Sequence, residues 1–269
     1  MRLFRMFSAL VLLLGLIIPL ETLAVEPARV GLNDVIDSVE QQFRVGKNGL
    51  PPLTTVAADF FQRSTVAAQN RELRADGQMF LKLATGSEPL MFRFDYFRPL
   101  TQEIICDGRS LWMYQPDNRR VILSDVRDTF DPDTRFNPER DRATNFLQGL
   151  GRISKDFEIT FASGVRDVGG NYVLELTPRR VSVSIAKLLL VVHKDAVLRH
   201  AYSRQGRNDY ALNRPELEFP ILSTTVIDPD GNTTTMEFSN IKTNVFLSDF
   251  FFKFMPPADV QVVRPPTGR

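Results

Sequence analysis

Residues 88–116 read EPLMFRFDYFRPLTQEIICDGRSLWMYQP and carry the clearest structural signal in the chain. Phe92, Phe94 and Tyr96 alternate with other residues, most of them charged, so a strand here places three aromatic rings on one face. Asp107-Gly108 favours a tight turn, because the turn requires a positive φ that glycine adopts at no steric cost. The stretch therefore predicts antiparallel strands, with 102–106 and 110–114 as the two arms of a hairpin.

Alternating segments extend from this stretch in both directions. Towards the N-terminus and just beyond the hairpin we expect strands at 56–67, 71–83, 90–97 and 120–126. Further strands are expected at 157–162, 172–176, 188–192 and 197–203, and the turn Asp228-Pro229-Asp230-Gly231 joins 224–227 to 233–238. Phe250, Phe252 and Phe254 are expected to end the sheet. Such a succession is typical of an antiparallel meander.

Two segments instead repeat apolar residues at helical spacing. The first has Asn33 as its expected N-cap, and the second starts at Asn137-Pro138, where asparagine suits the N-cap and proline the first helical position. Each helix is apolar on one side only, so each must bury that side against another element. The apolar sides consist of Val35, Ile36, Val39 and Phe43 in the first helix, and of Ala143, Phe146, Leu147 and Leu150 in the second.

This pattern predicts a mainly β protein with a single domain. We count about ten or eleven strands and two or three helices, and a sheet of that size curls or splits, because strongly twisted open sheets rarely exceed about ten strands. Curling gives a barrel or an unclosed half-barrel. The one-sided helices then plug or cover its open face.

The first 24 residues have the features of a secretory signal peptide. Arg2 and Arg5 form a basic start, residues 8–20 are apolar, and Thr22-Leu23-Ala24 offers a small-residue cleavage site. We expect cleavage after Ala24, which leaves 25–269 as the mature, exported domain. The alternative is an uncleaved anchor, but the apolar run is shorter than the about 20 residues that span a bilayer.

Composition narrows the class of protein. Cys106 is the only cysteine, so no disulfide forms within the chain. The formal charge of +1 falls to zero in the mature chain, because the signal peptide takes away two cations and one anion. A neutral chain has no general attraction to nucleic acid. The 21 phenylalanines instead supply apolar surface, either for a packed core or for an apolar pocket.

The sequence offers no recognisable catalytic or metal-binding motif. His193 and His200 flank a predicted turn outside any zinc signature, so we expect a structural or surface role for both. Neither a nucleophile elbow nor a glycine-rich phosphate loop occurs. We therefore expect no enzyme activity, no metal and no cofactor. One acidic cluster lacks the glycine and distal glutamate of a calcium loop; it consists of Asp125, Asp128, Asp131 and Asp133.

Several short motifs occur in order along nearly the whole mature chain. They are ADFFQ at 58–62, Pro89 with FRFDY at 92–96, Pro99, DG at 107–108, LWMYQP at 111–116, LELTP at 174–178 and FKFMPP at 252–257. Together with the signal peptide and the meander, these motifs resemble the LolA family, the periplasmic carriers that shuttle lipoproteins between the two bacterial membranes.

The resemblance implies an unclosed antiparallel half-barrel whose concave apolar face is covered by a lid of helices. It implies periplasmic localisation and acylated lipoproteins as cargo. The expected partners are an inner-membrane lipoprotein-releasing ABC transporter and an outer-membrane lipoprotein acceptor, and we expect the protein to be a monomer. The implied cavity wall consists of Phe92, Phe94, Tyr96 and Trp112, and the implied lid residues are Val39, Phe43, Phe146, Leu147 and Leu150.

Two features depart from the family pattern. The aromatic strand of the family commonly starts with an Arg-Pro pair whose arginine helps to hold the lid shut, whereas this chain has Glu88-Pro89. Residues 203–222 resemble an insertion before the Asp-Gly hairpin. How the lid is held is therefore left open.

Two other hypotheses remain open. A LolA-like carrier or sensor of another envelope lipid or glycolipid would use the same apolar face. A structural envelope protein would fill the half-barrel with its own side chains. An acyl chain favours burial by about 0.8 kcal/mol per CH₂ group, so either carrier requires an apolar concavity that helices cover when it is empty.

Overall fold

One large sheet dominates the structure. The computed structural model describes residues 29–44, 46, 52–85, 88–126, 149–164, 167–182, 184–207 and 212–264. Within these residues twelve strands form one sheet in the order β12-β6-β5-β4-β3-β2-β1-β11-β10-β9-β8-β7, one or two more than the sequence predicts. The strands are β1 (Thr55–Val66), β2 (Arg71–Lys82), β3 (Met91–Arg98), β4 (Gln102–Cys106), β5 (Ser110–Gln115), β6 (Arg120–Asp125), β7 (Phe157–Phe161), β8 (Tyr172–Pro178), β9 (Lys187–Val192), β10 (Ile221–Ile227), β11 (Thr233–Thr243) and β12 (Gln261–Val263).

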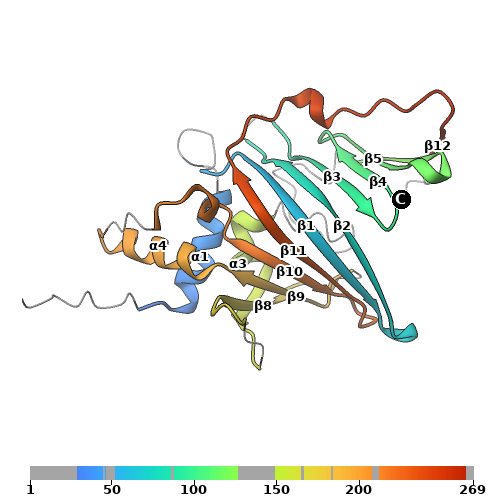
Figure 1. The fold of residues 1–269 in the computed structure, drawn as a ribbon. Helices are drawn as coiled ribbons and strands as arrows, with labels where there is room; N and C mark the ends of the chain where they lie inside the picture. Colours follow the sequence, from blue (N-terminus) through green and yellow to red (C-terminus); the bar gives the residue numbers. More distant parts are fainter. Residues whose placement is uncertain are drawn as a thin grey trace, which may run out of the picture.

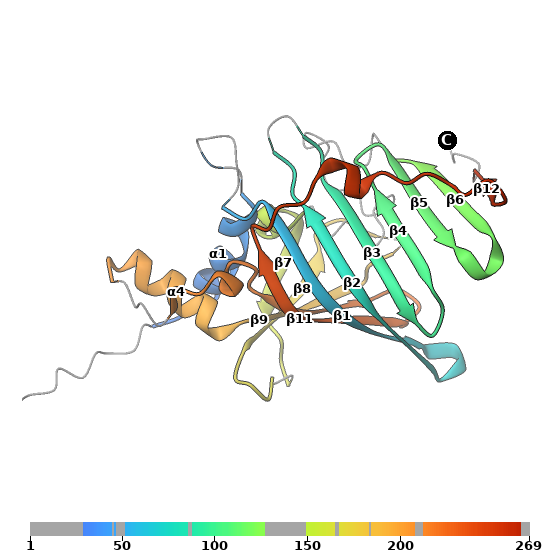
Figure 2. The same ribbon diagram turned by 45° about the horizontal axis from the view of Figure 1, so that its top comes forward.

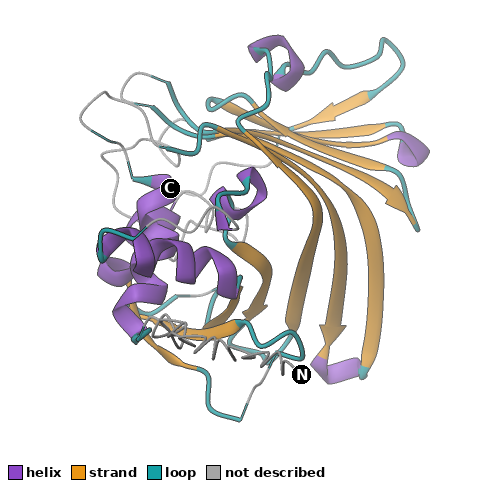
Figure 3. Ribbon diagram, turned by 60° about the vertical axis from the view of Figure 1, so that its left-hand side comes forward, coloured by secondary structure: helices purple, strands orange, loops and turns teal. Residues whose placement is uncertain are grey.

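The described strands form an antiparallel meander in two halves. Sequential strands pair from β1 to β6 and from β7 to β11, and β1 joins the halves by pairing with β11. Only β12 runs parallel to its neighbour β6. β7 and β12 are the two edge strands, so the sheet is not closed. In Figure 1, β12 and β8, the neighbour of β7, lie at opposite ends of the sheet. The sheet curls around the helices (Figure 3), which confirms the predicted mainly β, unclosed half-barrel.

The predicted turns are present. Asp107 Oδ1 accepts hydrogen bonds from the backbone N–H groups of Arg109 and Ser110, at 2.9 and 2.8 Å. Gly108 has a φ of +84°, the conformation for which glycine was expected. Gly231, in the turn between β10 and β11, has a φ of +80°. The hairpin signals in the sequence therefore identified both turns correctly.

The predicted first helix is α1 (Leu32–Phe43). It begins just before Asn33, and its N-cap is Gly31 rather than the predicted asparagine. The reason is local: Asp34 in the first turn accepts a hydrogen bond of 2.9 Å from the backbone N–H of Gly31. The helix ends at Phe43, close to the predicted end.

The second half of the chain differs from the prediction in its helices. Of the predicted second helix, Phe146 and Leu147 lie outside the described residues, as does the signal peptide at 1–24. Leu150 lies in the 3₁₀ helix η4 (Leu150–Arg152), which leads into α3 (Ile153–Asp156). Residues 197–203 are not a strand but part of α4 (Lys194–Arg204), which His193 caps by accepting a hydrogen bond from the N–H of Asp195.

The C-terminal segment also differs from the prediction. Phe250 and Phe252 lie in the 3₁₀ helix η7 (Asp249–Phe252), and the sheet ends instead with β12. Figure 2 shows residues 245–263, which we call the C-terminal strap, crossing β2 to β5 on the way to β12. Phe251 and Phe252 both make ring contacts, with Phe80 and with each other. Successive residues of a strand point to opposite faces, so a strand would not pack both in this way.

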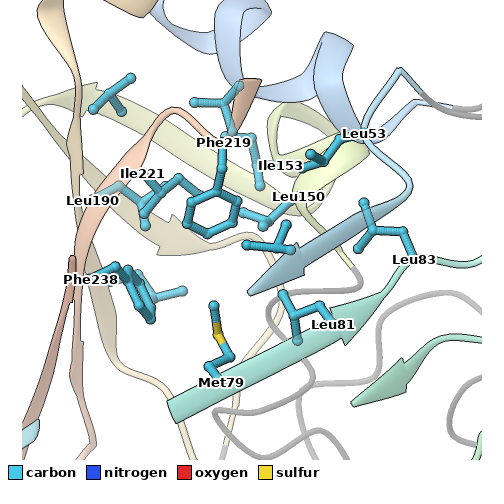
Figure 4. Packing of buried hydrophobic residues seen from close by; sticks show 14 of the residues in the cluster. Leu53, Met79, Leu81, Leu83, Leu150, Ile153, Leu190, Phe219, Ile221 and Phe238 are labelled. Atoms are coloured by element: carbon cyan, nitrogen blue, oxygen red, sulfur yellow. The ribbon is translucent and has the colours of Figure 1, made fainter. Parts of the chain in front are cut away.

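The core lies between the helices and the curled side of the sheet, which we call the concave face. Figure 4 shows Leu190, Ile221 and Phe238 facing Met79 and Leu81 across the interior, with Phe219 between them. The helices gather where β1 begins and β11 ends (Figure 1). Among the described residues, no helix is long and apolar enough to cross a membrane.

Candidate functional site

The three aromatic residues of β3 share the concave face, as the alternation predicts. Strand pairing sets Phe92 opposite Leu81, Phe94 opposite Met79 and Tyr96 opposite Gly77. Phe92 is fully buried and Phe94 is 3% exposed, whereas Tyr96 is half-buried. Burial therefore decreases along β3 from the end that the helices cover towards the hairpin tips.

An aromatic row extends these rings across the face. Phe60 of β1 contacts both Phe94 and Tyr96 edge to face, with ring centroids 5.8 and 4.9 Å apart. Phe60 stands opposite Phe238 of β11, which contacts Phe219 at 5.7 Å. Phe219 in turn contacts Phe43 of α1 at 6.1 Å. The row thus connects the first helix to the centre of the sheet.

Gly77 makes room for this row. A side chain at this position would meet the backbone oxygen of Asp95 and the ring of Phe60, at 2.0 and 2.8 Å from its Cβ. The absence of a side chain lets the rings of Phe60 and Tyr96 meet across β2. Glycine within a strand is typical of such a close approach.

The first helix seals the covered end of the concave face. Val39 is fully buried in the same cluster as Phe92, and Phe43 packs at its margin. Leu150 is also fully buried there, in agreement with its predicted apolar role. Glu40 is a buried carboxylate on α1 that accepts a hydrogen bond of 2.7 Å from the N–H of Ser154. This bond joins α1 to α3.

A second contact holds α1 to α4. Arg204 near the end of α4 donates to Asp34 at 2.8 Å and lies 3.6 Å from Asp37. Both aspartates belong to α1. No local sequence pattern predicts this pair, because 197–203 reads as a strand and the contact joins residues far apart in the chain.

Trp112 does not belong to the predicted wall. Trp112 pairs with Ile105, which pairs with Arg93. Arg93 follows Phe92 on β3, so its side chain points to the other face of the sheet. Strand register therefore places Trp112 on the outer face, away from Phe92. There its ring lies 6.4 Å from that of Phe254 in the C-terminal strap, and Tyr114 lies 5.3 Å from the same ring. Trp112 therefore anchors the strap and is removed from the candidate site.

Glu88 also takes part in a contact on the outer side. Its carboxylate lies 3.2 Å from the ammonium of Lys82, which pairs with Asp249 of the strap at 2.5 Å. The hydrogen bond to Asp249 raises the pKa of Lys82. Where the family pattern has an arginine, this chain thus has an anion that pairs with the lysine bound to the strap.

The remaining residues that could carry chemistry are the two histidines, the cysteine and the acidic cluster. Burial lowers the pKa of both His193 and His200. Burial also raises the pKa of the Cys106 thiol to about 12, as expected for a thiol packed among apolar groups. Among the described residues, no group of three or more His, Cys, Asp or Glu side chains is arranged to hold a metal ion. Of the acidic cluster, only Asp125 lies in the described part of the chain.

The fold and the site together define a class: one strongly curled, unclosed antiparallel sheet with an apolar concave face and helices set against it. A comparison with family models matches residues 52–202 to LolA, the outer membrane lipoprotein carrier protein. The match covers more than half of the chain, from β1 to α4, and the chain belongs to this family.

Curated relatives agree with this assignment. The chain is 23% identical over 210 residues to an outer-membrane lipoprotein carrier protein of Methylobacillus flagellatus, covering 78% of this chain and 82% of the relative. It is 28% identical over 211 residues to a protein of the same name from Nitrosospira multiformis, again covering 78% and 82%. The chain therefore spans most of the length of both relatives.

Solved structures are more distant. A LolA superfamily protein from Nitrosomonas europaea has a TM-score of 0.34 and 17% identity, covering 84% of this chain and 99% of that one. An uncharacterized conserved protein from Thermus thermophilus has a TM-score of 0.45 and 13% identity, covering 87% and 98%. Scores this low carry no functional argument.

Proposed function

We propose that this protein is a periplasmic carrier that binds the acyl chains of lipoproteins on its concave face and shuttles them from the inner to the outer membrane. Family membership and the names of the relatives support the proposal. The structural observation that carries it is the continuous apolar and aromatic surface from Phe43 through Phe60 to Phe92. An acyl chain requires such a surface to leave a membrane, because each CH₂ group favours burial by about 0.8 kcal/mol.

Uptake requires the helices to move. In the conformation described, Phe92 and Val39 are fully buried by the protein's own side chains. An acyl chain must therefore displace the helical layer, and α1 is the element that has to separate from the sheet. The layer in turn protects the apolar face from water when no cargo is bound.

Transfer needs no chemistry from this chain. Cargo passes to a second acceptor when that acceptor binds it more tightly, so the carrier acts without a catalytic group. The proposed donor is an inner-membrane lipoprotein-releasing ABC transporter, and the proposed receiver is an outer-membrane lipoprotein acceptor. A signal peptide at 1–24 would place the mature protein between them.

A release assay tests the proposal. Mature protein is incubated with energised inner-membrane vesicles that carry a radiolabelled lipoprotein, and the soluble fraction is analysed for a complex of the two. We expect a soluble complex of one carrier and one lipoprotein. Recovery of all lipoprotein in the vesicles, with a folded carrier, would overturn the proposal.

A matched pair of variants connects the assay to the concave face. Phe94→Gln places an amide in the aromatic row, whereas Phe97→Gln changes an exposed residue of the same strand. Circular dichroism and urea unfolding establish that each variant is folded before it is assayed. We expect Phe94→Gln to reduce complex formation several-fold more than Phe97→Gln, and equal loss in both would contradict the proposed site.

A further inference from the structure

Beyond the aromatic row, the concave face carries uncharged polar side chains that come from several strands. On β1 the next inward residues after Phe60 are Gln62 and Ser64, and on β3 the next after Phe94 is Tyr96. All three are half-buried. The polar belt, as we call it, takes its members from β11, β1, β3, β4 and β5 and is interrupted on β2, where Ala75 stands opposite Gln62. It consists of Thr234, Ser64, Gln62, Tyr96, Gln102 and Gln115.

Hydrogen bonds link the members of the polar belt. The Tyr96 hydroxyl donates to Gln62 Oε1 at 2.9 Å, and Gln62 Nε2 donates to Ser64 Oγ at 3.1 Å. Ser64 Oγ lies 3.3 Å from the hydroxyl of Thr234. Tyr96 stands opposite Gln102 in the strand pairing, and Gln115 Nε2 donates to Gln102 Oε1 at 3.3 Å.

The belt still has hydrogen-bonding capacity. A glutamine amide has two N–H donors and two acceptor positions. Within the described part of the chain, Gln62 uses one donor and one acceptor position in the belt. The second N–H and the second lone pair are therefore free, as far as the described residues go, to bind a group that enters along the face.

The charges on the concave face also limit which head groups the polar belt can bind. Burial raises the pKa of Tyr96 to about 12, so its hydroxyl stays neutral at any physiological pH. The described cations that share this face, Arg71 and Arg120, stand at hairpin ends and are exposed. A phosphate brought onto the belt would lose hydration without gaining a cation from the belt itself, which is costly. Esters, amides and hydroxyls would find both donors and acceptors.

From this we infer that the polar belt selects cargo with an uncharged, hydrogen-bonding head group and rejects phosphate-bearing lipids. The inference rests on the proposed function, since it assumes that acyl chains occupy the aromatic row. It gives the carrier a means of distinguishing its cargo from the anionic phospholipids that surround that cargo in a membrane. A lipopeptide and a neutral glycolipid share the head-group chemistry that the belt would bind.

Competition binding tests this selectivity. The mature protein is loaded with the methyl ester of a fluorescent fatty acid, an uncharged probe, which is displaced by three lipids with matched acyl chains: a triacylated lipopeptide, a monoglucosyl diacylglycerol and phosphatidylglycerol. We expect the neutral lipids to displace the probe at concentrations about tenfold or more below that of phosphatidylglycerol, the difference that one unpaired charge produces.

A positive charge introduced into the belt should largely cancel the preference for neutral lipids. Gln62→Lys supplies a cation, so it should improve competition by phosphatidylglycerol about tenfold relative to the lipopeptide. The matched control is Gln78→Lys, because Gln78 is an exposed glutamine on the outer face of β2 that bonds to Asp59. That variant should leave the ranking of the three lipids unchanged.

Each outcome bears on a different claim. Equal competition by all three lipids, or a preference for phosphatidylglycerol in the unmodified protein, overturns the selectivity inference alone. Failure of the probe and of every lipid to bind overturns the proposed function and the inference with it. A glucolipid preference of tenfold or more over the lipopeptide supports the belt but contradicts lipoprotein as the cargo.

Discussion

Glu40 on α1 accepts a hydrogen bond from the backbone N–H of Ser154, and this carboxylate is 3% exposed. Its second oxygen pairs with Arg44 one turn further along the helix. Helix N-termini leave N–H groups without partners, and a carboxylate is the preferred partner for them. Glu40 therefore joins the covering helix to the segment that follows Leu150.

Removing this carboxylate should loosen α1. Glu40→Ala leaves the N–H of Ser154 without its partner and should lower the free energy of unfolding by about 2 to 3 kcal/mol, as for hydrogen bonds to charged groups. Urea unfolding followed by circular dichroism measures the loss. The control is Glu237→Ala, which breaks an exposed pair with Arg63 and should cost less than about 1 kcal/mol. Equal losses would show that burial of Glu40 is unimportant.

The contact between Trp112 and Phe254 offers an optical probe of the C-terminal strap. Trp112 is the only tryptophan, so Phe254→Ala should shift the intrinsic emission to longer wavelength as water reaches the indole. Phe250→Ala is the control, because Phe250 lies in the same segment but is 69% exposed. An unchanged emission maximum in Phe254→Ala would contradict the packing of the strap on β5.

The Cys106 thiol should be unreactive in the native protein. It is fully buried opposite Phe92, and at its raised pKa of about 12 only about one thiol in ten thousand is ionised near pH 8. We expect a thiol reagent to modify the protein slowly in buffer and rapidly in urea. Rapid, complete modification of the folded protein would mean that the covered end of the concave face is open.

Acidification should destabilise the region around α4. Burial lowers the pKa of His193 and His200 in the folded state. Below about pH 6.5 the unfolded chain therefore binds more protons than the folded protein does. Stability from these residues is therefore complete above that pH and is lost as the pH falls through the folded pKa values. Protonation of His193 at Nδ1 would also remove the cap of α4.

A double variant isolates this effect. His193→Asn replaces the capping Nδ1 with an amide oxygen and does not titrate, and His200→Gln removes the second titrating ring. Urea midpoints at about pH 7.5 and pH 5.5 should differ less in the double variant than in the unmodified protein. If both proteins lose the same stability on acidification, the two histidines do not cause the pH dependence.

Strand positions were predictable because alternation and turn residues are local. The turns at Asp107-Gly108 and Gly231 require specific dihedral angles that few residues supply, so their sequences identified them. The side of the sheet on which Trp112 lies could not be predicted in this way. It depends on the pairing registers of β3 with β4 and of β4 with β5, and a shift of one residue in either reverses it.

The long-range contacts of the site could not be predicted from local sequence patterns. Phe219 completes the aromatic row from an irregular segment beside η6 (Pro215–Glu218), where neither strand nor helix periodicity applies. α4 was missed because its buried apolar residues, Ala196, Val197 and Ala201, are few, and because Lys194-Asp195 reads as a turn that leads into a strand. The polar belt was not predicted because its members come from five strands, and only the pairing registers bring them together.

The central claim is that acyl chains bind on the concave face. Photo-cross-linking tests it most directly, with a triacylated lipopeptide that carries a diazirine in one acyl chain and mass spectrometry to locate the modified residues. We expect labels on inward-facing residues of the aromatic row and its neighbours, Phe60, Phe94 and Met236. Labels confined to the outer residues Phe80, Trp112 and Tyr114 would contradict it.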